Sequence, residues 1–194
     1  MLRAVDEYDG AGVYIRELCN ALFEVDRYNH YVLFYMSDHQ LGRYGQVANV
    51  EERVVAAPGK LLWDQVFVPR TARREDLDVL FHYKFSIPFV APCPTVVQQR
   101  GTEYWTFPEY YTQPGDWVNR LYNMATIPLF CRRATRVLTN SDSSATELET
   151  LATVPRHKIS TVYAAAADSF FRTPTPCSWT GFGPSTIYRK PHSF

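Results

Sequence analysis

Apolar residues recur along the chain with two spacings, one typical of helices and the other of buried strands. A helical stripe at i, i+3, i+4 and i+7 predicts an amphipathic helix between Val13 and Val25, and it is formed by Ile15, Leu18, Cys19 and Leu22. Tyr31–Tyr35 is a compact apolar run without polar alternation. Such a run is typical of a strand that is covered on both faces, as in a parallel sheet.

Further along the chain, short apolar runs predict more strands, at Val50–Ala56, Leu77–His82, Thr95–Gln99, Arg136–Thr139 and Ile159–Tyr163. A helical stretch begins at Leu61 and extends toward Arg74, and Pro69 is expected to kink or end it. Strands that alternate with helices in this way imply βαβ units and an α/β fold with a mainly parallel sheet.

Two later helices carry more specific expectations. The helix from Trp117 to Ala134 is predicted to place one apolar side toward the core, made of Leu121, Met124, Ile127, Phe130 and Cys131. In the next helix, Ser144 and Glu147 have the spacing of a capping box. After Phe171 the chain is rich in Thr, Pro and Gly, which predicts a domain over residues 1–172 and a linker over 173–194.

Composition narrows the class of protein. The chain has 194 residues with 20 Lys and Arg against 20 Asp and Glu, and this balance gives no electrostatic reason to expect a nucleic-acid partner. The four cysteines have no metal-binding spacing and are expected to be reduced, mostly buried thiols of a cytoplasmic protein. No apolar run is long enough for a membrane span, and no metal site is expected.

Loops that follow parallel strands are where ligands usually bind, and the first such loop is rich in glycine. This segment is Asp9–Tyr14, directly before the first helix, and it contains Gly10, Ala11 and Gly12. Glycines allow a close backbone approach, and a helix N-terminus offers amide donors to a phosphate group. A plain glycine turn with a helix cap explains the same residues equally well.

A second polar loop, Gln98–Tyr104, follows the strand that begins at Thr95 and contains Arg100, Gly101, Thr102 and Glu103. Its donors and acceptors suit a sugar, and the guanidinium suits a phosphate, although a solvated polar loop has the same composition. Beside it lies an aromatic cluster, for which a packing role is favoured over a sugar-stacking platform, made of Tyr104, Trp105, Phe107, Tyr110 and Tyr111.

Three more side chains lie at predicted strand ends. His82 is either a catalytic candidate or a structural residue, and the structural role is favoured. Asn140 and Ser141 either contact a ligand or cap the following helix, and capping is the simpler explanation. At the end of the long helix lie Arg132, Arg133 and Arg136, which would suit a membrane surface. The helix dipole also accounts for cations there, and this explanation suffices unless the exposed face of the helix is apolar.

Taken in order, these segments resemble the N-terminal domain of family 4 glycosyltransferases through about residue 172. The resemblance is carried by GAGVYIREL (10–18), LLWDQ and VPR (61–70), DVLFH (78–82), APCPTVV (91–97), FPEYY (107–111), PLFCRRATRVLTNS (128–141) and KISTVY (158–163). It implies one Rossmann-like half of a GT-B architecture, in which two such domains face each other across a cleft.

The resemblance also implies a function. Family members transfer a sugar from a nucleotide-sugar donor, a co-substrate and not a bound cofactor, with retention of configuration. The N-terminal domain supplies the acceptor side, so this chain is expected to be inactive alone and its tail to lead into a donor domain. The acceptor is a glycan, a lipid or another hydroxyl compound, and a lipid would imply peripheral contact with the inner face of a membrane. The first alternative is a non-catalytic binding or scaffold module. A flavodoxin-like or other single-domain nucleotide binder is less favoured, because it should have a recognisable phosphate loop.

Several residues can be carried over from the family pattern. Gly10 and Gly12 match the family's glycine loop, which faces the donor phosphates, and Asn140 with Ser141 matches the family's Val-Ser or Asn-Ser pair at a strand end. Arg100 stands where many members have a histidine that is discussed as catalytic. This departure argues against a role that depends on a histidine here, although the guanidinium could still hold a phosphate or a sugar hydroxyl. The catalytic residue is therefore not identified, and the two candidates are His82 and Arg100.

Overall fold

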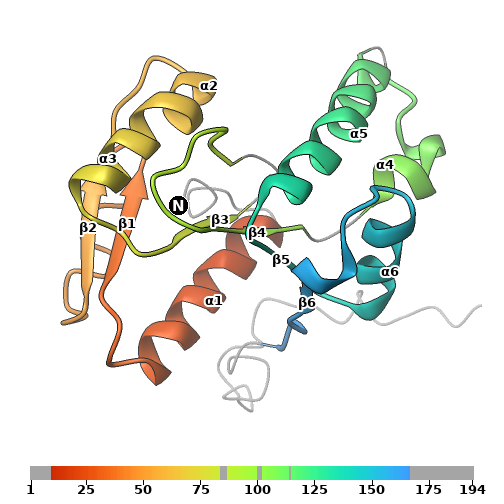
Figure 1. The fold of residues 1–194 in the computed structure, drawn as a ribbon. Coiled ribbons are helices and arrows are strands. Elements are labelled where there is room, and N and C mark those ends of the chain that lie inside the picture. The colour runs from red at the N-terminus through yellow and green to blue at the C-terminus, as the bar shows by residue number, and fades with distance from the viewer. Residues whose placement is uncertain (1–9, 84–86, 100–101, 114, 167–194) are drawn as a thin grey trace, which may run out of the picture. The chain divides into compact units, whose positions relative to one another are not determined.

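The computed structural model describes residues 10–83, 87–99, 102–113 and 115–166, and all helices and strands given below lie there (Figure 1). The chain divides into two units, Met1–Ala164 and Ala165–Phe194. The described elements all belong to the first unit. The predicted linker over residues 173–194 lies outside the described residues.

Parallel pairing joins the described strands into two groups. β1 (Tyr31–Tyr35) pairs with β2 (Val50–Val54), with Tyr31 opposite Val50. A four-stranded sheet contains, in this order, β3 (Leu80–Tyr83), β4 (Thr95–Gln98), β5 (Arg136–Thr139) and β6 (Ile159–Thr161). All the pairs are parallel, which confirms the predicted α/β class with a parallel sheet flanked by helices.

Helices connect most of these strands (Figure 1). The longer ones are α1 (Gly10–Val25), α5 (Asp116–Arg133) and α6 (Asp142–Thr150). Between β2 and β3 the chain forms α2 (Lys60–Leu62), a π-helix (Trp63–Phe67) and α3 (Val68–Arg74). Shorter turns are α4 (Glu103–Thr106) and the 3-10 helices Pro108–Tyr110 and Arg156–Lys158.

β1 is covered on both faces, as its unbroken apolar run predicts. Leu33 and Tyr35 pack in one core cluster with Ile15 of α1. Phe34 points to the other face and packs with Trp63 and Val68 from the helices between β2 and β3. A third cluster lies between β4, β5 and β6 on one side and α5 and α6 on the other.

Pro69 does not end its helix, so of the two expected effects, a kink or an end, the second does not occur. The backbone N–H of Val68 bonds to the carbonyl of Trp63, five residues earlier, so the turn before the proline is widened into a π-helix. Pro69 then falls in the first turn of α3, where a missing N–H is tolerated. The helical path therefore continues through the proline to Arg74.

The predicted apolar side of α5 is only partly right. Ile127, Phe130 and Cys131 are buried and Met124 packs against them, but Leu121 is 52% exposed. Asn123 is buried in its stead and donates to the carbonyl of Asn119 at 2.7 Å. The expectation for Leu121 was wrong because α5 carries apolar residues on both sides, so apolar spacing alone does not identify the inward one.

The described cysteines are free thiols, and two of them are buried. Burial raises the pKa of Cys19 to about 11 and that of Cys131 to about 12. Both thiols therefore stay protonated at neutral pH and serve as small apolar side chains of the core. Cys93 is half-buried, and Cys177 lies outside the described residues.

Candidate functional site

The carboxyl ends of β3, β4 and β5 bring polar side chains to one edge of the sheet, here called the carboxyl edge. The parallel registers place Tyr83, Gln98 and Leu138 in one row. Pairing continues one residue further, because Gln99 N–H donates to the carbonyl of Leu138 at 2.8 Å. Gln98 is only 2% exposed, and Gln99 is fully buried. These amides are therefore held in fixed positions by the sheet itself.

The first turns of α1 are attached to this edge. The hydroxyl of Tyr14 accepts a hydrogen bond of 2.6 Å from Nε2 of Gln98. Its ring stacks on that of Tyr83, with the two centroids 5.9 Å apart and the planes inclined by 20°. Since Tyr14 follows Gly10 by four residues on the same helix face, the glycines of α1 are fixed relative to β3 and β4.

Gly10, Ala11 and Gly12 form the first turn of α1 and not a loop before it, which corrects the sequence prediction. Gly10 is exposed, and a Cβ built there would meet no described atom within 4 Å. Neither a turn nor packing against the described residues therefore requires a glycine at position 10. The arrangement keeps what phosphate binding needs, backbone amides at a helix N-terminus with open space beside Gly10.

Two buried acceptor atoms at the carboxyl edge have no hydrogen-bond donor within the described ranges. They are Oε1 of Gln98, whose Nε2 already bonds to Tyr14, and Oδ1 of Asn140, directly after β5. Buried polar atoms are normally paired, and an unpaired one is costly. A sugar hydroxyl could donate to either oxygen.

Ser141 caps α6, as the simpler of the two explanations proposed. Its backbone is extended, and Oγ accepts a hydrogen bond of 3.1 Å from the backbone N–H of Ser144. The capping box predicted at Ser144 and Glu147 is therefore wrong by three residues. Glu147 instead accepts a hydrogen bond from the hydroxyl of buried Thr102 and so joins α6 to the loop after β4. Glu103 begins α4.

The two catalytic candidates differ in how the structure places them. His82 is fully buried within β3. Because side chains alternate along a strand, it points to the face opposite to that of Tyr83. Arg100 and Gly101 lie outside the described residues, between Gln99 and Thr102 in the chain.

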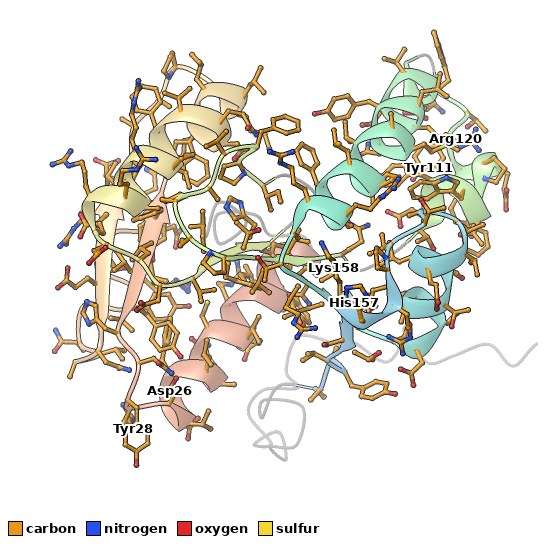
Figure 2. The ribbon with its side chains drawn as sticks, viewed as in Figure 1. Asp26, Tyr28, Tyr111, Arg120, His157 and Lys158 are labelled. Atoms are coloured by element: carbon orange, nitrogen blue, oxygen red, sulfur yellow. The ribbon has the colours of Figure 1, made fainter. Side chains whose placement is uncertain are left out.

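The aromatic cluster separates into a packed pair and an exposed pair. Tyr104 and Tyr111 stack with their centroids 5.3 Å apart, and Nε of Arg120 from α5 donates to the carbonyl of Tyr104 at 2.6 Å (Figure 2). Burial raises the pKa of Tyr104 to about 12. This pair has the packing role favoured from the sequence. Phe107 and Tyr110 also stack, but they are 44% and 70% exposed.

Asp142, at the start of α6, organises the chain after β6. Its carboxylate accepts hydrogen bonds from the hydroxyls of Tyr163, at 2.6 Å, and Thr161, at 2.7 Å. These two bonds hold the pKa of Asp142 below its usual range. The segment that leaves the sheet after Thr161 is thereby fixed to the helix that follows β5.

Over the described ranges, no cluster of three or more His, Cys, Asp or Glu side chains is arranged to hold a metal ion. No helix in the same ranges combines the length and apolar character needed to span a bilayer.

Sequence reasoning missed the contact that organises the site. Tyr14 was read as part of the glycine segment and Gln98 as part of the polar loop, with no reason to join them. The one signal was that the amide of Gln98 lies at a strand end and the phenol of Tyr14 lies near the start of a helix. Both positions are at the edge of the sheet where ligands bind. The partner of each could not be identified without the sheet order.

Comparisons with known proteins give one finding. A family model described as Glycosyltransferase Family 4 matches residues 8–166, a range that includes all the helices and strands given above. A search of curated proteins found no match to the chain.

Proposed function

Because the chain belongs to glycosyltransferase family 4, we propose that its carboxyl edge is the acceptor side of a retaining glycosyltransferase. The reaction would move a hexosyl or pentosyl group from a nucleotide sugar to a hydroxyl group of a glycan, a lipid or another acceptor. The observation that supports this most is the extent of the family match, which covers every strand whose carboxyl end contributes to the edge.

The described residues suggest a division of roles at this edge. The amides of Gly10 and Gly12 would face the phosphates of the donor at the N-terminus of α1. The side-chain oxygens of Gln98 and Asn140, which have no donor among the described residues, would orient sugar or acceptor hydroxyls. In the transfer, a bond forms between the acceptor oxygen and the anomeric carbon. The bond from that carbon to the phosphate oxygen breaks, and the nucleoside diphosphate leaves with the electron pair and takes up the proton of the acceptor hydroxyl.

Arg100 is proposed as the group that stabilises charge on the departing phosphate or holds a sugar hydroxyl. A guanidinium presents paired N–H donors that match phosphate oxygens, and it cannot act as a base near neutral pH. His82, buried in β3, is proposed to act by positioning its neighbours. Catalysis at such a site is a matter of positioning and electrostatics.

Transfer also needs a domain that binds the nucleotide, and we propose that this chain provides only the acceptor half. The protein would act in the cytoplasm, at the inner face of the membrane if the acceptor is a lipid. Alone, the chain is expected to release nucleoside diphosphate from nucleotide sugars no faster than a buffer control. Turnover by the isolated chain at ordinary enzyme rates would contradict the proposal.

A chimera supplies the positive experiment. The chain is fused to the donor domain of an active family 4 enzyme, and release of nucleoside diphosphate is measured with a panel of acceptors. We expect acceptor-dependent release that Asn140→Ala reduces and that the exposed control Asn29→Ala leaves unchanged. Acceptor binding without any turnover would instead favour a non-catalytic binding or scaffold module.

A further inference from the structure

The outward side of α5 is apolar along most of its length. Five large apolar side chains there are exposed, namely Trp117 (63%), Val118 (52%), Leu121 (52%), Tyr122 (60%) and Leu129 (47%). At about 100° per residue they fall, together with exposed Ala125, within one half of the helix. The other half carries Ile127, Phe130 and Cys131 into the core. We call the exposed half the outer face of α5.

The charge on this outer face has a single sign. Arg132 and Arg133 lie on it at the C-terminal end of α5, and both are exposed. The acidic residue of α5, Asp116, falls on the opposite half by the same helical geometry. The outer face thus runs from Trp117, through aliphatic residues, to two arginines.

A third cation adjoins the arginines. Nζ of Lys158, which precedes β6, donates to the carbonyl of Arg132 at 2.6 Å and to that of Ala134 at 3.0 Å. Figure 2 labels Lys158 beside the end of α5. Arg136, the first residue of β5, is also exposed. The positive charge is thus concentrated at one end of the apolar face.

The exposed apolar face beside Arg132 and Arg133 gives these arginines a second explanation besides the helix dipole. The helix dipole alone accounts for cations in a last turn, but it does not account for an exposed face of Trp, Tyr, Leu and Val. Such a face, with arginines at one end and no acid on it, has the composition of a helix that lies in a membrane interface. Trp and Tyr favour the headgroup region, and cations favour anionic lipids.

We propose that the outer face of α5 binds the surface of an anionic lipid bilayer. The 18 residues of α5 give an apolar strip about 27 Å long, parallel to the membrane plane. Charge complementarity selects this occupant, because a neutral protein surface would leave the arginine end without a counter-charge. The contact is peripheral, and it does not depend on whether the carboxyl edge transfers sugar.

Vesicle flotation tests the proposal on the complete chain without nucleotide or acceptor. The vesicles contain either phosphatidylcholine alone or a mixture of phosphatidylcholine and phosphatidylglycerol. We expect the chain to float with the mixed vesicles, and Leu121→Gln to weaken binding by about tenfold, the effect of one buried leucine. The matched control is Leu41→Gln, because Leu41 is 51% exposed and Leu121 is 52% exposed. Circular dichroism verifies that each variant is folded.

Two further variants separate the apolar and the charged contributions. Arg132→Gln should weaken binding to the mixed vesicles by about fivefold and leave binding to phosphatidylcholine unchanged. The emission of Trp117 should shift to shorter wavelength on binding, and Trp117→Phe should remove that shift. Absence of flotation, or an equal loss in Leu41→Gln, overturns the proposal. Self-association without lipid that Leu121→Gln abolishes also overturns it, because a second copy would then cover the face.

Discussion

The hydroxyl of Tyr14 and the carboxamide of Gln98 are joined by a 2.6 Å hydrogen bond, although 84 positions separate the two residues in the chain. The bond connects the first turns of α1 to the end of β4. Because the Tyr14 ring also stacks on Tyr83, α1 is attached to two neighbouring strands at their carboxyl ends. The proposed phosphate-facing glycines therefore share one rigid framework with the proposed sugar-binding amides.

Removal of one oxygen tests this connection. Tyr14→Phe keeps the ring against Tyr83 and leaves Nε2 of buried Gln98 without its acceptor, so stability should fall by about 1–3 kcal/mol. Urea unfolding followed by circular dichroism measures the change. The control is Tyr28→Phe, because Tyr28 is 99% exposed and should tolerate the substitution. Equal stability of both variants would show that the bond does not contribute to the fold.

Gly10→Ala separates folding from ligand binding. An added Cβ meets no described atom within 4 Å, and alanine favours a helix, so stability should stay the same or rise by up to about 1 kcal/mol. The same Cβ occupies space that a phosphate would need, so binding of a nucleoside diphosphate should weaken. Calorimetric titration measures the affinity. Gly59→Ala, at another open glycine, should bind as the natural chain does.

Much of the fold was predictable from local patterns. Tyr31–Tyr35 became a strand with the predicted bounds, because an unbroken apolar run suits a strand with helices on both faces. Arg136–Thr139 likewise matched its prediction. Parallel order followed from the alternation of strands and helices, and Ser141 as a cap followed from its place at a strand end.

What failed depended on contacts distant in sequence or on backbone detail. The π-helix that accommodates Pro69 has no signal in apolar spacing. Leu121 was assigned to the core because α5 itself carries apolar residues on both sides, and only the packed structure shows which half faces outward. Glu147 was assigned to a capping box, whereas its partner, Thr102, lies 45 positions earlier in the chain.

The cap of α6 gives a third prediction. Ser141→Ala removes the acceptor for the backbone N–H of Ser144, and stability should fall by about 1 kcal/mol. Ser143 is exposed and lies in the first turn of α6, so Ser143→Ala should change stability by only a few tenths of that value. Both are measured by urea unfolding. A loss at Ser143 as large as that at Ser141 would contradict the assignment of the cap.

Asp26 gives a prediction for the dependence of stability on pH. Its carboxylate accepts from the side chain of Asn29, from the hydroxyl of Tyr31 and from two backbone N–H groups, and these bonds hold its pKa well below the usual range. Because the pKa of Asp26 is lower in the folded protein than the unfolded value of about 3.9, the ionised carboxylate stabilises the fold at pH values above about 3.9. This contribution is lost as the pH falls from there toward the folded pKa.

Asp26→Asn should therefore make unfolding stability less dependent on pH below about pH 4 than it is in the natural chain. Urea unfolding at a series of acidic pH values gives the slope. Asp38→Asn, at an exposed position, is the control and should keep the original slope. An unchanged slope for Asp26→Asn would show that these hydrogen bonds are not the source of the acid sensitivity.

Membrane binding and sugar transfer would act on separate parts of the fold. The outer face of α5 is defined by residues between Trp117 and Arg133, whereas the carboxyl edge is formed by α1 and the ends of β3, β4 and β5. A variant such as Leu121→Gln should therefore leave nucleotide binding unchanged. Conversely, Gly10→Ala should leave vesicle flotation unchanged.

We propose that the first turn of α1, at the carboxyl edge, faces the phosphates of the sugar donor. Nuclear magnetic resonance of the labelled chain, titrated with a nucleoside diphosphate, can detect this contact. We expect weak binding with shifts at the amides of Gly10 and Gly12 and at Nε2 of Gln98, and Gly10→Ala should diminish these shifts. Absence of shifts at these three groups, or shifts confined to residues remote from this edge, would contradict it.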